Sequence, residues 1–247
     1  MNSILKLENI NKNYHTKEGE ITAIKDINLD INKGDIISLV GPSGCGKSTL
    51  LSIIANLTDY NGKVIKDNNL KISYMLQSDA LLPYLTIHEN AILGLKINNN
   101  LTEDNIKYVD DLLKFYNLYE FKNKYPNSLS GGMKQRVALI RTLATKPDLL
   151  LLDEPFSSLD NMTRLIISND VYNIIKKEKK TTILVTHNIE EAITFSNKVI
   201  ILSKRPSTIK NIVNIDITNN NSIYERRKDN KYNYYFDIIW KDLDINE

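Results

Sequence analysis

One stretch of nine residues has the composition and spacing of a loop that binds phosphate groups. It reads Gly41, Pro42, Ser43, Gly44, Cys45, Gly46, Lys47, Ser48 and Thr49. Glycines let backbone N–H groups close around phosphate oxygens where a strand passes into a helix. Lys47 can reach the β- and γ-phosphates, and the Ser48 hydroxyl can bind Mg²⁺. We therefore predict that the chain binds a nucleoside triphosphate.

Two adjacent carboxylates follow the apolar run Leu149–Leu152. A continuous apolar run is typical of a parallel strand that is buried on both faces. Ligands of open α/β sheets bind at the carboxyl ends of such strands. We therefore predict that Asp153 holds Mg²⁺ and that Glu154 polarises an attacking water as a general base. A solvated acidic strand end is the less favoured alternative.

Gln77 and His187 also follow apolar segments that we predict to be strands, Ile72–Leu76 and Thr181–Thr186. A lone glutamine is normally a surface residue, and a lone histidine is usually structural. These two differ because their strands should end at the same edge of the sheet as Asp153.

Two further features have weaker signals. Ser130 is a natural N-cap for a following helix, and Gly131 and Gly132 leave N–H groups free in its first turn, so this helix end can bind an anion. A capped surface helix explains the same residues. Tyr14, just after the first predicted strand, can stack on an adenine, although an ordinary half-buried tyrosine is the more frequent case.

The elements that must position these residues alternate between strands and helices. Apolar segments at 4–10 and 21–31, separated by a turn, predict a β-hairpin region at the N-terminus. Residues 102–118 predict an amphipathic helix that interrupts the alternation, with Thr102 as its N-cap, which suggests an inserted α-helical subdomain. A terminal helix is predicted from an apolar stripe of Tyr232, Phe236, Ile239 and Leu243.

Composition excludes several classes of protein. A net charge of +2 gives no support for a nucleic-acid surface. The single cysteine, Cys45, excludes an intrachain disulfide and fits a reducing compartment. No apolar run approaches the ~20 residues that span a bilayer, and the N-terminus lacks the pattern of a signal peptide. We expect a soluble cytosolic protein that acts on a membrane only through a partner.

The irregular apolar segment Leu81–Ile87, which contains Pro83, has two interpretations. It is either core of the helical subdomain or a docking surface for another protein. From the residues alone, core is the more frequent case.

The order of these motifs closely resembles the nucleotide-binding subunit of ABC transporters. The resemblance rests on Gly41–Thr49, Gln77, Leu129–Arg136, Leu149–Pro155, Ser157–Asp160 and His187. It implies an α/β P-loop NTPase of the ABC type, with a mixed sheet core, an N-terminal antiparallel β region and an inserted α-helical subdomain. The single domain, 1–247, would comprise an ATP-binding core, about 1–78 and 145–247, and a helical signature subdomain, about 79–144.

The resemblance also implies a head-to-tail homodimer with two composite ATP sites. Ser130, Gly131 and Gly132 of one chain would hold the γ-phosphate that Lys47 of the other chain binds. The other implied roles are Glu154 as general base, His187 at the γ-phosphate, Gln77 bridging Mg²⁺, water and the membrane partner, Tyr14 on adenine, and Asp160 communicating across the dimer.

Three segments are similar to the ATPases of nitrate/sulfonate/taurine/bicarbonate importers and of thiamine-precursor importers. They are Ala80–Thr86, Leu159–Arg164 and Ile201–Pro206. This similarity implies a peripheral subunit on the cytoplasmic side of the cell membrane, docked near Asp79–Asn90 to permease subunits and served indirectly by an extracytoplasmic solute-binding protein. Tyr84, Asn161-Met162 and Asn56 depart from the usual residues, which leaves ATP chemistry untouched but weakens any assignment of cargo.

Two rival interpretations are disfavoured. A soluble ABC ATPase of DNA repair needs a long coiled coil between the phosphate loop and Ser130, but most positions there are already assigned to other elements. An ABC ATPase of translation usually carries two cassettes, whereas this chain has one. A regulatory module with dead chemistry conflicts with competent residues at every catalytic position.

Overall fold

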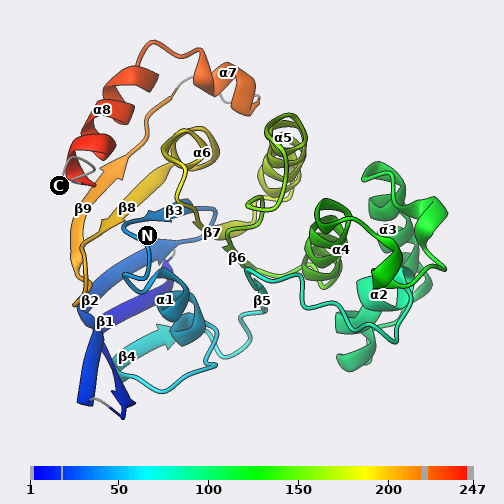
Figure 1. Ribbon diagram of the computed structural model, residues 1–247, viewed down its shortest axis with the longest axis horizontal. Coiled ribbons are helices and arrows are strands. Elements are labelled where there is room, and N and C mark those ends of the chain that lie inside the picture. The colour runs from blue at the N-terminus through cyan, green and yellow to red at the C-terminus, as the bar shows by residue number, and fades with distance from the viewer. Residues whose placement is uncertain (1–2, 18, 218–221, 244–247) are drawn as a thin grey trace.

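Two β-sheets form the layered part of the protein in the computed structural model, which describes residues 3–17, 19–217 and 222–243 (Figure 1). The smaller sheet is antiparallel, in the order β2-β1-β4. Its strands are β1 (Ser3–Thr16), β2 (Gly19–Asn32) and β4 (Asn61–Lys66). The larger sheet has the order β5-β6-β7-β3-β8-β9, and only β9 runs antiparallel to its neighbour. The predicted mixed sheet and N-terminal antiparallel region are confirmed.

The strands of the larger sheet are short and mostly buried. They are β3 (Ile36–Val40), β5 (Ile72–Met75), β6 (Leu149–Asp153), β7 (Thr181–Val185), β8 (Lys198–Leu202) and β9 (Ile209–Asn214). Along β6, Leu149 and Leu151 pack into the core beneath the antiparallel sheet, whereas Leu150 and Leu152 pack against the helices on the other face. Since successive side chains of a strand point to opposite faces, a strand covered on both sides needs this unbroken apolar run.

The helices divide between the two faces of the larger sheet. Residues of α1 (Lys47–Ile54) belong to the core shared with β1 and β2, and residues of α5 (Asn161–Lys177) belong to the core on the opposite face. The short helix α6 (Ile189–Phe195) packs with α8 (Tyr232–Asp242), preceded by α7 (Ile223–Arg227). The predicted terminal stripe is confirmed, because α8 buries Tyr232 and Ile239.

Three helices lie together to one side of the sheets (Figure 1). They are α2 (Ile87–Ile97), α3 (Glu103–Phe115) and α4 (Gly131–Ala144), and two short 3-10 turns, Tyr119–Phe121 and Pro126–Ser128, connect α3 to α4. Their core is continuous with Met75 and Leu152 of the sheet. This arrangement fixes α4, and the Ser130 at its start, to the edge of the sheet formed by β5 and β6.

An N-cap residue in the sequence marks the start of each of these three helices, and two of the three starts were predicted. Thr102 caps α3 and Ser130 caps α4, as predicted, each accepting a hydrogen bond from a backbone N–H in the first turn. The start of α2 at Ile87 was not predicted. Thr86 and Glu89 form a reciprocal capping box there, and a threonine followed three residues later by glutamate indicates such a start.

One boundary differs from the prediction. Tyr14 lies within β1, paired with Ile21 of β2, because the hairpin is longer than its apolar segments and continues through several register shifts. None of the helices in the part of the chain that the structure describes combines the length and the apolar character of a membrane span.

Candidate nucleotide site

The phosphate loop connects β3 directly to α1, in the predicted strand–loop–helix order. Gly44 and Gly46 have φ of +70° and +114°, in the left-handed region that glycine adopts without strain. Gly46 is also the N-cap of α1. These two residues let the backbone turn sharply at the helix start, where free N–H groups attract phosphate.

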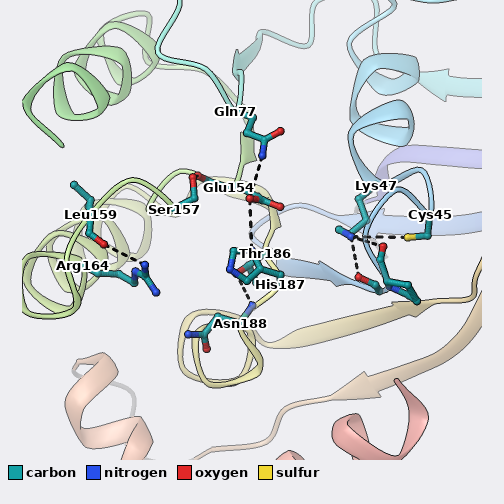
Figure 2. A network of polar contacts seen from close by, with 12 residues as sticks. Cys45, Lys47, Gln77, Glu154, Ser157, Leu159, Arg164, Thr186, His187 and Asn188 are labelled. Atoms are coloured by element: carbon teal, nitrogen blue, oxygen red, sulfur yellow. Dashed lines mark hydrogen bonds and ion pairs between the residues drawn. The ribbon is translucent and has the colours of Figure 1, made fainter. Parts of the chain in front are cut away.

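The Lys47 ammonium lies over this loop. It donates hydrogen bonds to the carbonyl oxygens of Gly41 (2.8 Å) and Pro42 (2.9 Å), and it lies 3.9 Å from Sγ of the buried Cys45 (Figure 2). The lysine side chain is itself buried. A positive charge is therefore held beside the loop, where a β- or γ-phosphate would neutralise it.

A cavity of about 570 Å³ opens above the loop. Ten residues predicted for the site line it: Tyr14, Ser43, Gly44, Gly46, Lys47, Ser48, Thr49, Gln77, Glu154 and His187. Ala23 and Arg205 also line it and were not predicted. The Tyr14 hydroxyl lies 3.3 Å from Oγ1 of Thr49, so the ring is tied to the first helical turn at the edge of the cavity. Residues from six separate parts of the chain thus face one space: the β1–β2 hairpin, the phosphate loop with the start of α1, and the segments after β5, β6, β7 and β8.

The carboxylate of Glu154 lies between the two other strand-end residues predicted for catalysis, Gln77 and His187, and contacts both. Its Oε2 accepts a hydrogen bond from Nε2 of Gln77 (3.2 Å) and lies 3.5 Å from Nδ1 of His187 (Figure 2). The backbone of Glu154 has φ of +47°, which is strained for a residue with a side chain. Its N–H donates to Val185 and its carbonyl accepts from Gln135 and Ser157, so β7, α4 and the following loop hold this conformation. The carboxylate is fixed toward the cavity.

A second set of polar contacts holds the loops behind Glu154 and His187 (Figure 2). The N–H of Asn188 donates to the Thr186 hydroxyl (3.1 Å), and Arg164 donates to the carbonyl of Leu159 (3.1 Å). Burial raises the pKa of the nearby Glu191, and a hydrogen bond with Thr186 partly offsets that effect. Sequence reasoning missed Arg164 and Glu191 because neither stands at a strand end.

Asp153 is buried at the end of β6, on the face that carries α1. Its Oδ2 accepts a hydrogen bond from the Tyr74 hydroxyl (3.2 Å), and its Oδ1 has no hydrogen-bond partner among the described residues. Burial raises the pKa of Asp153, and the nearby hydroxyls of Ser48 and Tyr74 offset this in part. Burial, with the nearby Asp153 charge, raises the pKa of Tyr74 to about 12.

The donor set suits Mg²⁺ held largely by a substrate. Asp153 offers a buried oxygen without a partner, and the Ser48 hydroxyl and the Gln77 amide belong to the same site. The described residues include no group of three His, Cys, Asp or Glu side chains placed to hold a metal ion. Magnesium often takes one or two protein ligands and completes its shell with waters and phosphates, so these residues fit it.

The raised pKa of Asp153 leads to a stability prediction. A carboxylate whose pKa is higher in the folded than in the unfolded state destabilises the fold above its unfolded pKa, and this effect disappears as pH falls through the folded pKa. Without nucleotide or Mg²⁺, Asp153→Asn should therefore unfold at a higher temperature than wild type at pH 7. The difference should shrink as the pH is lowered.

Thermal unfolding against pH measures this difference, with the exposed Asp237 on α8 changed to asparagine as the control. ATP hydrolysis by Asp153→Asn should be lost at the same time. A variant that is less stable than wild type at pH 7, or a difference independent of pH, would contradict the account of Asp153.

Some predicted site residues lie elsewhere in the single chain. The start of α4, formed by Ser130, Gly131 and Gly132, is not among the described residues that line the cavity. Asp160 uses its carboxylate to cap α5, accepting from the N–H groups of Met162 (3.1 Å) and Thr163 (3.0 Å). Gly41, Pro42 and Cys45 do not line the cavity either, and they contact the Lys47 ammonium instead.

The segment Asp79–Asn90, for which the resemblance implies a docking surface and the residues alone favoured core, is only partly exposed. Tyr84 is 71% exposed, but Leu81 packs against the core, and Leu82 and Leu85 are half-buried. The buried Asn90 explains this, since it accepts from the N–H of Leu82 and donates to three carbonyls of the loop. Arg141 of α4 donates to the carbonyls of Asp79 and Ala80. The segment is a fixed loop with one prominent aromatic side chain.

Comparisons with known proteins agree with this geometry. Residues 24–157, more than half of the chain, match the family model described as ABC transporter. The chain is 44% identical to the ABC transporter ATP-binding protein YtlC of Bacillus subtilis (strain 168), over 99% of this chain and 97% of that protein. It is 37% identical to the aliphatic sulfonates import ATP-binding protein SsuB of Bacillus thuringiensis subsp. konkukian (strain 97-27), over 91% of this chain and 89% of SsuB.

A solved structure has the same fold. It is the dimeric post-hydrolysis state of the ATP-binding cassette MJ0796, bound to ADP and Pi. The TM-score is 0.77 at 33% identity, covering 86% of this chain and 99% of that one.

Proposed function

Because the chain belongs to the ABC transporter family as an ATP-binding subunit with ATPase activity, we propose that it powers an importer of small sulfonate-like anions and that Glu154 is its general base. The observation that carries the catalytic assignment is the meeting of Glu154, Gln77 and His187 across the cavity from the phosphate loop.

Each group of residues around the cavity has its own role in hydrolysis. The loop N–H groups and Lys47 bind the phosphates and neutralise charge that develops on them. Glu154 accepts the proton of the attacking water, while Gln77 and His187 hold that carboxylate and face the γ-phosphate. Tyr14 stacks on the adenine at the edge of the cavity. Mg²⁺, when held by Asp153, Ser48 and Gln77, supplies charge neutralisation at the phosphates.

We further propose a head-to-tail homodimer with two composite sites. Ser130, Gly131 and Gly132 form a capped helix start that can bind an anion, yet they do not reach the cavity of their own chain. A second copy can bring them to the γ-phosphate, and the Leu159–Asp160 loop then lies at the interface. The dimeric MJ0796 cassette, which is bound to ADP and Pi, supports a homodimer by similarity.

The name of the relative SsuB supports the choice of cargo. A sulfonate carries a charge, so its uptake needs a permease to which this chain docks on the cytoplasmic side of the membrane, with a solute-binding protein outside. An importer of thiamine precursors is the second candidate, and a soluble ABC ATPase without a transport partner is the third. Growth of a deletion strain on aliphatic sulfonates as the sulfur source separates the first from the others, since normal growth contradicts the proposed cargo.

Docking to the permease should depend on Tyr84. This exposed ring stands on a loop fixed by Asn90 and Arg141, a few residues after Gln77. Tyr84→Ser should leave the ATPase activity of the isolated chain within about twofold of wild type, because the side chain packs on little of its own protein. Pull-down with the permease should fall by about tenfold or more, since buried tyrosines often dominate interface energy.

The matched control is Tyr234→Ser, which removes a similarly exposed tyrosine from α8. If both variants pull down the permease as well as wild type, the docking surface lies elsewhere. If Tyr84→Ser lowers the unfolding temperature markedly, the segment Asp79–Asn90 belongs to the core of the helical subdomain, which is the other interpretation of its sequence.

A further inference from the structure

Arg205 lines the nucleotide cavity although no motif assigned it a role there. It lies in the connection between β8 and β9, far along the chain from the phosphate loop, and its Nε donates a hydrogen bond of 2.6 Å to the carbonyl of Gly44. A Cβ on Gly44 would lie 2.9 Å from the terminal nitrogen Nη2 of Arg205. The guanidinium therefore rests directly on the loop that binds phosphate.

The backbone around Arg205 is tied to β2. Ser207 is fully buried, its N–H donates to the carbonyl of Ala23 (3.0 Å), and its carbonyl accepts from the N–H of Lys25 (2.9 Å). Within the same connection, the N–H of Ser203 donates to Thr208. Since Ala23 itself lines the cavity, these bonds place the base of the arginine side chain at the cavity wall.

The bond to Gly44 orients the guanidinium and uses only one of its nitrogens. An arginine side chain carries five N–H donors in a planar fork that matches phosphate oxygens. Among the described residues, the two terminal nitrogens of Arg205 have no hydrogen-bond partner, and the side chain is exposed to the cavity. They are thus available to a ligand that lies in the loop.

We propose that Arg205 binds the phosphate chain of the nucleotide from the Gly44 side of the loop, adding a second cation to that of Lys47. The proposal rests on nucleotide binding at this loop. It differs from base stacking, for which Tyr14 is already placed at the cavity edge. A guanidinium bound to the phosphates acts through charge, so its effect must be absent for a ligand without phosphates and must weaken as the salt concentration rises.

The test compares the affinity of the whole chain for ATP, ADP and adenosine, measured by competition with a fluorescent nucleotide. Arg205→Ala should weaken ATP and ADP about tenfold, in line with the loss of a charge-assisted hydrogen bond at an exposed site. Adenosine should bind as it does to wild type, and raising the salt concentration should reduce the difference for ATP. Arg205→Lys keeps the charge but loses the planar fork, so its affinity for ATP should lie between those of wild type and Arg205→Ala.

Lys204→Ala is the matched control, because Lys204 carries the same charge one residue away and does not line the cavity. An unchanged affinity for ATP in Arg205→Ala overturns the proposal. So does an equal loss for adenosine, which would indicate contact with the base, or an equal loss in Lys204→Ala, which would indicate a general charge effect.

Lys47→Ala separates this proposal from the site itself. If Lys47→Ala weakens ATP binding and Arg205→Ala does not, only the role of Arg205 is wrong. If neither variant changes ATP affinity, the nucleotide site is wrongly placed. Unfolding temperatures of all four variants should lie within a few degrees of wild type, which shows that the affinities compare folded proteins.

Discussion

A Glu154→Gln variant should hydrolyse ATP about 10²–10⁴-fold more slowly than wild type, which is the contribution expected of a general base. Glutamine has the same shape, and its side-chain oxygen can still accept the hydrogen bond from Gln77 that the carboxylate accepts now. It cannot take a proton from water. The loss should therefore appear in kcat, while the affinity for ATP changes little.

Steady-state hydrolysis and equilibrium binding of ATP measure the two quantities on one preparation. Glu103→Gln, an exposed glutamate in the first turn of α3, is the control and should hydrolyse ATP like wild type. Turnover of Glu154→Gln within a few fold of wild type would remove Glu154 from the role of base. A loss of ATP affinity as large as the loss of turnover would instead make it a binding residue.

The second large effect concerns the sharing of each site between two chains. Lys47→Ala and Ser130→Arg homodimers should both be inactive, the first from loss of the phosphate contact and the second from a bulky side chain at the start of α4. An equal mixture should regain about a quarter of wild-type activity if the sites work independently, because half of the dimers are mixed and each mixed dimer keeps one intact site.

The reverse mixture provides the control. A chain carrying both substitutions, mixed equally with wild type, leaves no intact site in the mixed dimer if Lys47 and Ser130 act across the interface. It leaves one intact site if they act within a chain. Wild-type homodimers alone give the reverse mixture about a quarter of wild-type activity, so only activity above that level counts as recovery there. Recovery in the reverse mixture but not in the first would contradict a composite site. No recovery in the first mixture and only that quarter in the reverse one would mean that both sites must be intact for turnover.

Much of the site could be predicted because its signals are local. The phosphate loop is a short pattern that needs only its own glycines and lysine, and the run before Asp153 reflects burial on both faces of β6. The N-caps Thr102 and Ser130 are set by the first turn of their own helices. Each of these depends on residues within a few positions along the chain.

What could not be predicted depends on distant parts of the chain. Arg205 meets Gly44 only because the β8–β9 connection pairs with β2, which no local pattern indicates. Leu82 is half-buried because Asn90 holds the loop, whereas the residues of the segment alone left both core and docking surface open. Tyr14 stays within β1 because the hairpin continues beyond its apolar residues.

The positions of Ser130 and Lys47 in an ATP-bound Glu154→Gln dimer test the central claim most directly. The slow variant should accumulate the nucleotide-bound dimer, so its structure can be determined with ATP in place. We predict that the γ-phosphate held by Lys47 of one copy lies within hydrogen-bond distance, about 3 Å, of the Ser130 hydroxyl and the Gly132 N–H of the other. A monomeric complex with ATP, or a dimer in which Ser130 lies far from both γ-phosphates, would contradict it.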